Sequence, residues 1–188
     1  MRSLVAAAIL LCAGGGAAAA AHGPCVLTSA DKIANRRLTF QQFDQDGVTR
    51  STWRALDLAG CHALAAEAAD DYLANGPAQT EGHKSDILFH EAQSLAYNGD
   101  RIVAARLVAA AIPPGRGRHG ELDWTAYLTG TWAFLAKDRA TLDAAARKMA
   151  AELGDSNALD GGILKGLLQC FDKPYAEAYV ACRPLRRK

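Results

Sequence analysis

The stretch from Leu88 to Ala111, LFHEAQSLAYNGDRIVAARLVAAA, consists of two apolar-patterned segments separated by a short polar turn. Apolar residues recur at spacings of four and three on both sides of the turn, at Leu88, Ala92 and Leu95 and then at Ala104, Val108 and Ala111. These spacings put the residues of each segment on one face of a helix. In the turn, Gly99 interrupts the helix and Asp100 suits the N-cap of the next one. The stretch therefore predicts a helical hairpin.

The same hairpin pattern recurs along the chain. The approximate turn markers between the two helices of each hairpin are Gly60, Gly99, Lys137 and Lys173, and offsets of 39, 38 and 34 residues bring the helices of the four hairpins into register. In the first helix of each hairpin, the aligned apolar positions are Trp53, Ala92, Gly130 and Leu164, then Leu56, Leu95, Ala133 and Leu167. In the second helix they are Ala65, Ala104, Leu142 and Ala176, then Ala69, Val108, Ala146 and Val180, then Tyr72, Ala111 and Met149, with Arg183 breaking the pattern. We therefore expect a domain of hairpin repeats over residues 50–183.

This pattern resembles the tetratricopeptide repeat family. The best match, Leu88 to Ala111, reads L-x3-A-x2-L-x3-G-D-x3-A-x3-V-x2-A. That family has a repeat of about 34 residues, with small residues where the two helices cross. The resemblance covers residues 50–182 and is closest in the second and third hairpins, while unequal repeat lengths and an out-of-register proline depart from the family. It implies an all-α fold of stacked antiparallel hairpins, an α-solenoid, with a closed helical bundle as the alternative.

Composition agrees with an all-helical chain. Half of the 188 residues are hydrophobic, yet aromatic residues make up only 7%. Alanine is the commonest apolar residue and is the best helix former, because it has no side-chain entropy to lose. Runs of β-branched residues, which favour strands, are nearly absent. The length corresponds to one ordinary domain.

The first 21 residues have the features of a secretory signal peptide. Arg2 supplies the positive charge, residues 4–12 form a short apolar core, and Ala19-Ala20-Ala21 fits the small-residue cleavage rule. A membrane anchor would need a run of about 20 residues with a higher hydrophobicity than this alanine-rich segment has. We therefore expect a mature chain that begins at His22, spans no membrane and is periplasmic or secreted. Intact-mass measurement of the exported protein would test this cleavage.

Outside the repeats, the sequence has less pattern. Residues 22–49 read as an irregular segment, with a possible helical turn over Ser29–Asn35, a possible short helix over Thr39–Asp44 and a turn at Asp46-Gly47. Residues 184–188 form a basic tail.

Without the signal peptide, which carries Arg2, the chain has 20 basic and 20 acidic side chains. A balanced charge argues against nucleic acid as a partner.

Four cysteines remain after signal cleavage, at Cys25, Cys61, Cys170 and Cys182. An even number in an exported chain predicts two disulfides, and a Cys-x-x-Cys pair typical of metal sites is absent. Three pairings are possible, of which we favour Cys25–Cys61 and Cys170–Cys182. On one tight hairpin Cys182 would lie about 10 Å further from the turn than Cys170, too far for a disulfide. The second pair therefore needs an irregular turn or an early helix end.

Motifs that carry catalysis or hold metals are incomplete. His90-Glu91 begins like a zinc-protease helix, but Ser94 stands where the second histidine is needed. Asp44-x-Asp46-Gly47 has only part of a calcium loop. No Gly-x-Ser-x-Gly or phosphate-binding glycine loop occurs. We therefore expect no enzyme activity, no cofactor and no metal.

The resemblance implies a concave groove lined by first-helix residues. In register these are Arg54, Asp57, Phe89, Gln93, Tyr97, Trp124, Tyr127, Thr131, Phe134 and Lys165. An aromatic strip with a polar rim is what an anchor for a peptide requires, but these aromatics could instead fill the core. We interpret the chain as an exported bacterial helical-repeat protein that binds a protein or peptide in the periplasm or cell envelope. The alternative is a compact helical envelope protein with a structural, small-molecule or metal-binding role.

Overall fold

The fold is all-helical in a computed structural model that describes residues 25–114, 117, 122–152 and 154–183. The signal peptide over 1–21, its cleavage site and the basic tail over 184–188 lie outside these residues. Within them the elements are α1 (Ser29–Asn35), η1 (Gln41–Asp46), α2 (Trp53–Leu58), α3 (His62–Asn75), α4 (Glu81–Tyr97), α5 (Arg101–Ala111), α6 (Trp124–Ala136), α7 (Arg139–Ala151), α8 (Asp155–Gln169) and α9 (Tyr175–Ala181). Among these elements, none combines the length and the apolar character that crossing a bilayer demands.

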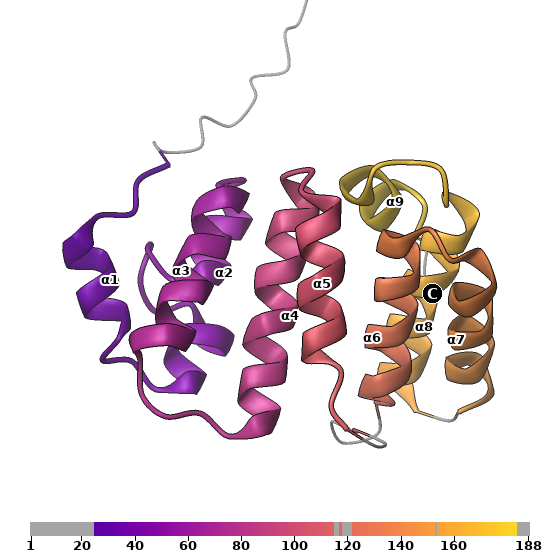
Figure 1. Ribbon diagram of the computed structural model, residues 1–188, viewed down its shortest axis with the longest axis horizontal. Coiled ribbons are helices and arrows are strands. Elements are labelled where there is room, and N and C mark those ends of the chain that lie inside the picture. Colours follow the sequence, from indigo (N-terminus) through magenta and orange to yellow (C-terminus); the bar gives the residue numbers. More distant parts are fainter. Residues whose placement is uncertain (1–24, 115–116, 118–121, 153, 184–188) are drawn as a thin grey trace, which may run out of the picture.

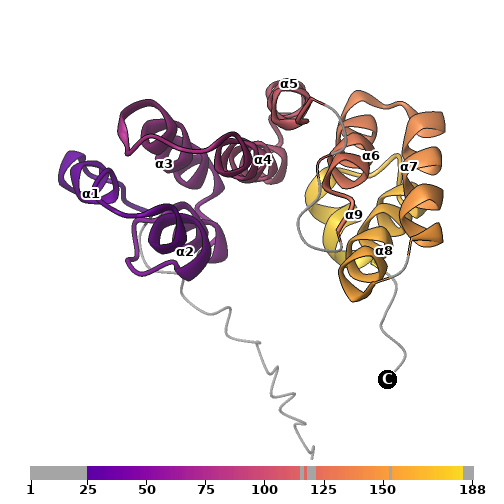
Figure 2. The same cartoon turned by 90° about the horizontal axis from the view of Figure 1, so that it is seen from below.

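Helices that follow one another in the sequence pack against one another in space (Figure 1). The hairpins α2–α3, α4–α5 and α6–α7 correspond to the first three predicted repeats. Between hairpins, α3 packs on α4, α5 on α6 and α7 on α8. Seen from below, α3, α4 and α5 lead from α1 towards the group α6–α9 (Figure 2). Sequential packing of hairpins is thus confirmed, whereas a regular solenoid stays a prediction.

Three of the four predicted turn markers, Gly60, Gly99 and Lys137, adopt a backbone conformation with positive φ that ends a helix. Gly60 and Gly99 have φ of 78° and 94°, a region open to glycine because it has no Cβ. Lys137 takes a left-handed conformation with φ of 63° and caps the C-terminus of α6. Its ammonium donates a hydrogen bond of 2.6 Å to the carbonyl of Phe171 and lies 4.7 Å from the ring centre of Phe134. These contacts offset the strain of a non-glycine residue at this turn.

Burial confirms the predicted register in the first three hairpins. Trp53, Ala92 and Gly130 are buried on the first helices, and Ala65, Ala104 and Leu142 on the second. In α9 the predicted register is wrong. Val180, expected inside, is 69% exposed, whereas Tyr175 and Ala178 are buried. The reason is that α9 packs on α4 as well as α8, so that it turns a different side inward.

Both favoured disulfides are present. Cys25 and Cys61 have Cα atoms 5.5 Å apart, and those of Cys170 and Cys182 are 6.2 Å apart. The early helix end that the second pair needs is found, since α8 ends at Gln169 and α9 begins only at Tyr175. The Cys182 backbone lies so close to α8 that a Cβ added at Gly166 would stand 2.8 Å from the Cys182 carbonyl oxygen. Glycine is therefore needed where the end of α9 crosses α8.

The N-terminal segment is more ordered than the sequence indicates. The helical turn expected over Ser29–Asn35 is α1, and its Thr28 forms a capping box with Asp31. The short helix expected over Thr39–Asp44 is instead the π-helical turn η1, which ends at Gly47 with φ of 58°. Ion pairs Lys32–Glu67 and Arg36–Asp71 attach α1 to α3.

Two apolar clusters form the core, and α4 contributes to both. One cluster gathers η1, α2 and α3, with Phe43, Tyr72 and Ile87 fully buried. The other gathers α4 to α9 and includes Phe89. Because Ile87 and Phe89 lie on different sides of α4, this helix joins the two halves of the chain into one structure.

Ala104 offers a test of the hairpin register. It is fully buried on α5, in the position assigned to the helix crossing, and replacing it with leucine should lower the free energy of unfolding by about 1–3 kcal/mol through overpacking. The matched control is Ala109→Leu, the same change at an exposed position of α5, which we expect to stay within about 0.5 kcal/mol of the wild type. Urea denaturation measures both, and equal losses would contradict the register.

Candidate functional site

The residues predicted to line a groove fall into three classes of burial. Phe89, Trp124, Tyr127, Thr131 and Phe134 are at most 6% exposed and belong to the core. Arg54, Asp57, Gln93 and Tyr97 are half-buried, and Lys165 is exposed. Trp124 and Tyr127 pack edge-on against Phe89, with ring centres 5.1 and 5.4 Å away. The aromatic strip therefore lies inside the protein, as the core interpretation expects, and its role in partner binding stays a prediction.

Helix α9 covers the side of α4 on which Gln93 and Tyr97 lie. The amide Nε2 of Gln93 donates a hydrogen bond of 3.1 Å to the hydroxyl of Tyr175. The ring of Tyr97 contacts Tyr175 and Tyr179, with ring centres 5.3 and 5.7 Å apart. Tyr175 also lies against Phe134 of α6. We call this surface, made by Gln93, Tyr97 and Phe134, the α9 seat.

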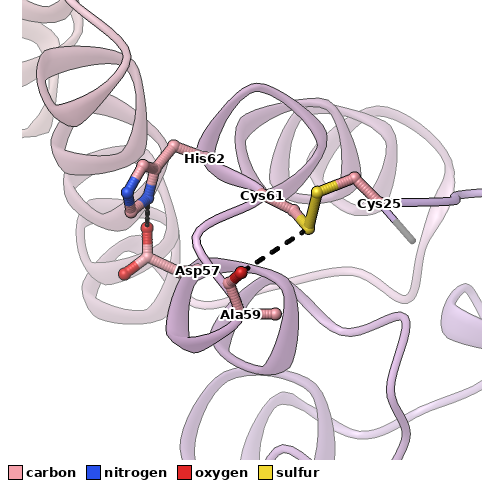
Figure 3. The surroundings of a disulfide bond; sticks show 5 residues. All are labelled: Cys25, Asp57, Ala59, Cys61 and His62. Carbon is pink, nitrogen blue, oxygen red and sulfur yellow. Dashed lines mark hydrogen bonds and ion pairs between the residues drawn. A yellow bond between two sulfur atoms is a disulfide. The ribbon is translucent and has the colours of Figure 1, made fainter. Parts of the chain in front are cut away.

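A polar cluster lies next to the α9 seat and beside the first disulfide. Figure 3 shows Asp57 at the end of α2 facing His62 at the start of α3, which directly follows Cys61. The Nδ1 atom of His62 lies 2.7 Å from Oδ1 of Asp57, and the hydroxyl of Ser94 donates to the same oxygen at 3.1 Å. The ring of His62 stacks on Tyr97.

This cluster contains a serine, a histidine and an aspartate, but its geometry differs from that of a nucleophile site. A catalytic serine hydrogen-bonds to the histidine that takes its proton. Here Ser94 is fully buried and donates to Asp57 instead. The cluster consequently connects α2, α3 and α4 and positions Tyr97 in the α9 seat.

A second histidine joins η1 to α4. Asp44, fully buried in η1, lies 2.8 Å from Nδ1 of His90, and its backbone carbonyl accepts a hydrogen bond from Nε of Arg54. His90 stacks on Trp53, with ring centres 4.2 Å apart. These contacts orient Arg54, one of the predicted groove residues. Among the residues that the structure describes, no group of three or more His, Cys, Asp or Glu side chains is placed to hold a metal.

Two carboxyl groups of α4 have raised pKa values. Burial raises the pKa of Glu91 to about 7, with a smaller contribution from the negative charge of Asp70. Burial and the neighbouring Asp44 raise the pKa of Asp86 to about 7 as well. Between pH 4.5 and 7 the folded chain therefore holds protons that the unfolded chain has released. Stability falls as pH rises through this window.

Glu91→Gln should remove much of this pH dependence. Glutamine stays neutral, so the variant should be more stable than the wild type by about 1–3 kcal/mol at pH 8, where Glu91 must be ionised in a buried site, and nearly unchanged at pH 4. Thermal or urea denaturation at the two pH values measures this. Glu81→Gln, at an exposed glutamate of the same helix, is the control and should show no such difference. A destabilised Glu91→Gln at pH 8 would contradict the assignment.

A hollow of about 310 Å³ opens beside the α9 seat. It lies where the turns α4–α5, α6–α7 and α8–α9 meet, at Gly99, Lys137 and Asp172–Pro174 respectively. Apolar atoms of Phe134, Tyr175 and neighbouring residues line it together with cationic side chains. Phe134 belongs both to this lining and to the predicted groove. The sequence pattern did not indicate Tyr175, because the predicted register of α9 turned other residues inward.

The comparisons with known proteins leave the chain without an assigned family. No family model, no curated protein and no solved structure matches it.

Proposed function

We propose that this chain is a non-enzymatic module that binds a protein or peptide segment outside the cytoplasm, in the periplasm or cell envelope. The observation that supports this best is the α9 seat, in which a short helix carrying two tyrosines lies against polar and aromatic side chains of α4 and α6. Recognition of a helix through aromatic anchors in a groove is a common way for proteins to bind peptides. The partner in this proposal presents a similar tyrosine-bearing segment and competes with α9.

Helix α9 has the properties of an exchangeable occupant. It is seven residues long, and isolated helices of this length are unstable in water. Its place therefore depends on packing by Tyr175 and Ala178 and on the Cys170–Cys182 disulfide. A short element with so few buried side chains opens locally at a lower free energy than the rest of the domain. Local opening of α9 would free the seat for a partner.

The two disulfides support the proposed compartment. Disulfides persist in oxidising environments such as the periplasm and are rare in cytosolic proteins.

A separate observation, the hollow at the hairpin turns, favours the alternative function, in which the chain is a compact helical protein that binds a small molecule.

The proposal can be tested with a peptide copy of α9. A fluorescent peptide of residues 174–183, with serine at position 182, would be titrated into the wild-type protein and into a Tyr175→Ala/Tyr179→Ala variant whose own α9 is weakened. We expect binding to the variant that is about tenfold tighter or more, since its seat is free. The Tyr179→Ala variant, which removes the less buried tyrosine, is the milder version if the double variant is too unstable.

Two controls accompany this experiment. Val180→Ala changes an exposed residue of α9 and should leave the seat occupied, so that the peptide binds as weakly as to the wild type. A peptide lacking both tyrosines should not bind any of the proteins. Failure of the tyrosine peptide to bind the weakened variants would overturn the helix-in-groove function.

A further inference from the structure

The hollow at the hairpin turns has an unbalanced charge. Its lining includes three cationic residues, Arg101, Lys137 and Lys173, and one carboxylate, Asp172. Lys173 is already paired with Glu177 of α9, at 2.9 Å. Arg101 and Lys137 instead donate their hydrogen bonds to the backbone carbonyls of Leu135 and Phe171. Both acceptors are neutral, and among the residues that the structure describes neither cation forms an ion pair.

The two cations also act on each other. The pKa of Lys137 is lowered, first by burial and then by the positive charge of Arg101, with Asp172 opposing the effect. Arg139 adds a further positive charge nearby, over the ring of Phe171. Like charges that share a site disfavour one another, and Asp172 offsets only part of this repulsion, so an anion placed between the two cations would reduce it further.

The carbonyl contacts hold both cations in place. Arg101 begins α5 and reaches the end of α6, while Lys137 ends α6 and reaches the turn after α8. In each case the hydrogen-bond acceptor lies 34 residues further along the sequence, in the next hairpin. The packing of three successive hairpins therefore positions the cations. Both residues are exposed, but these contacts restrict their side chains, so less conformational entropy is lost when they bind an anion than with unrestrained side chains.

The rest of the hollow is suited to an apolar group. Its wall consists of Ala96, Phe134, Leu135, Pro174 and Tyr175. Its volume of about 310 Å³ lies at the small end of the range of ligand sites, about 300–1,000 Å³. A bare inorganic ion would leave this wall unused, whereas an organic acid would bury its apolar part there.

We propose that this hollow is a binding site for an organic carboxylate, whose head group lies between Arg101 and Lys137 and whose apolar body lies against Phe134 and Tyr175. The site does not depend on displacement of α9, because Tyr175 in its docked position forms part of the wall. Two sources of such a ligand have the same chemistry, a free apolar acid and the C-terminus of a peptide that ends in an apolar residue.

Calorimetric titration of the intact, disulfide-bonded protein tests the site with three organic probes and with inorganic phosphate. N-acetyl-phenylalanine represents a peptide C-terminus, 3-phenylpropanoate represents a free acid, and N-acetyl-phenylalaninamide is a neutral control of the same shape. We expect at least one carboxylate to bind about tenfold or more tightly than the amide, as loss of a charge-assisted hydrogen bond requires. The tighter of the two carboxylates identifies the source. Equal binding of the amide, or inorganic phosphate binding as tightly as the acids, would overturn the proposal.

Two variants connect binding to the named cations. Lys137→Asn removes the charge and keeps a residue that tolerates the left-handed turn, and Arg101→Gln removes the charge at the start of α5. Each should weaken carboxylate binding by about fivefold or more while amide binding stays unchanged. Lys165→Gln, at an exposed lysine of α8, is the matched control and should bind like the wild type. Unchanged affinity in both folded variants would refute the site, whatever the outcome of the α9 peptide experiment.

Discussion

Replacing Tyr127 with alanine should lower the free energy of unfolding by about 3–5 kcal/mol, the range for large aromatic side chains removed from a core. Tyr127 is only 4% exposed, and its ring packs against Phe89 and Trp124. Burial also raises the pKa of its hydroxyl well above the usual value. Removing the ring would leave a cavity in the middle of the larger apolar cluster. Urea denaturation followed by circular dichroism measures the loss.

Two further variants separate the possible causes of this loss. Tyr127→Phe keeps the ring and tests the hydroxyl alone, which should account for about 1 kcal/mol. Lys165→Ala changes an exposed member of the predicted groove and should have an effect within about 0.5 kcal/mol. A Tyr127→Ala variant of nearly wild-type stability that loses affinity for a partner would show that Tyr127 is a binding anchor rather than a core residue.

Removing the Cys25–Cys61 disulfide should have an effect of similar size. The bond closes a sequence separation of 36 residues, and a loop of this length gives a stabilisation of about 4 kcal/mol through the entropy of the unfolded chain. It also fixes the start of the N-terminal segment to the residue that precedes α3 (Figure 3). The double variant Cys25→Ser/Cys61→Ser avoids a free thiol, and its urea midpoint can be compared with that of the wild type.

The second disulfide provides the comparison. Cys170–Cys182 closes only 12 residues, so the variant Cys170→Ser/Cys182→Ser should lose about 3 kcal/mol, less than the first pair. The reverse order would contradict an explanation based on the unfolded chain alone. It would mean that the docking of α9 in the folded state depends strongly on its disulfide.

Local features of the chain were predictable because their causes lie within a few residues. The turn at Gly99 follows from a residue without a Cβ, and Asp138 accepts a hydrogen bond from the backbone of Thr141 as an N-cap should. The similar expectation for Asp100 was not met, since that carboxylate accepts from Asn98 instead of capping α5. Even at a predicted cap, then, a neighbouring side chain decides which hydrogen bond forms.

The position of α9 shows where local patterns are insufficient. With seven residues, the helix has too few apolar positions to define one face. Its predicted register therefore depends only on the alignment with the other hairpins. Packing on α4 and α8 turns Tyr175 and Ala178 inward instead, and Val180 is left exposed. The polar cluster of Asp57, His62 and Ser94 could not be predicted from the sequence either, because its members come from three helices.

The amino-acid sequence was sufficient to predict the helical hairpins, their turns and the inward faces of the first three pairs, because alanine content, glycine turns and three- and four-residue spacings act within a single helix or turn. The pairing of the cysteines could be favoured from the sequence, but the irregular end of α8 that allows it became visible only in the structure. Tertiary packing alone decided that the aromatic strip is buried, that α9 occupies its own seat and that Arg101 and Lys137 meet at one hollow. These outcomes depend on contacts between residues 34 or more positions apart, whose free energies are set by the relative placement of whole hairpins.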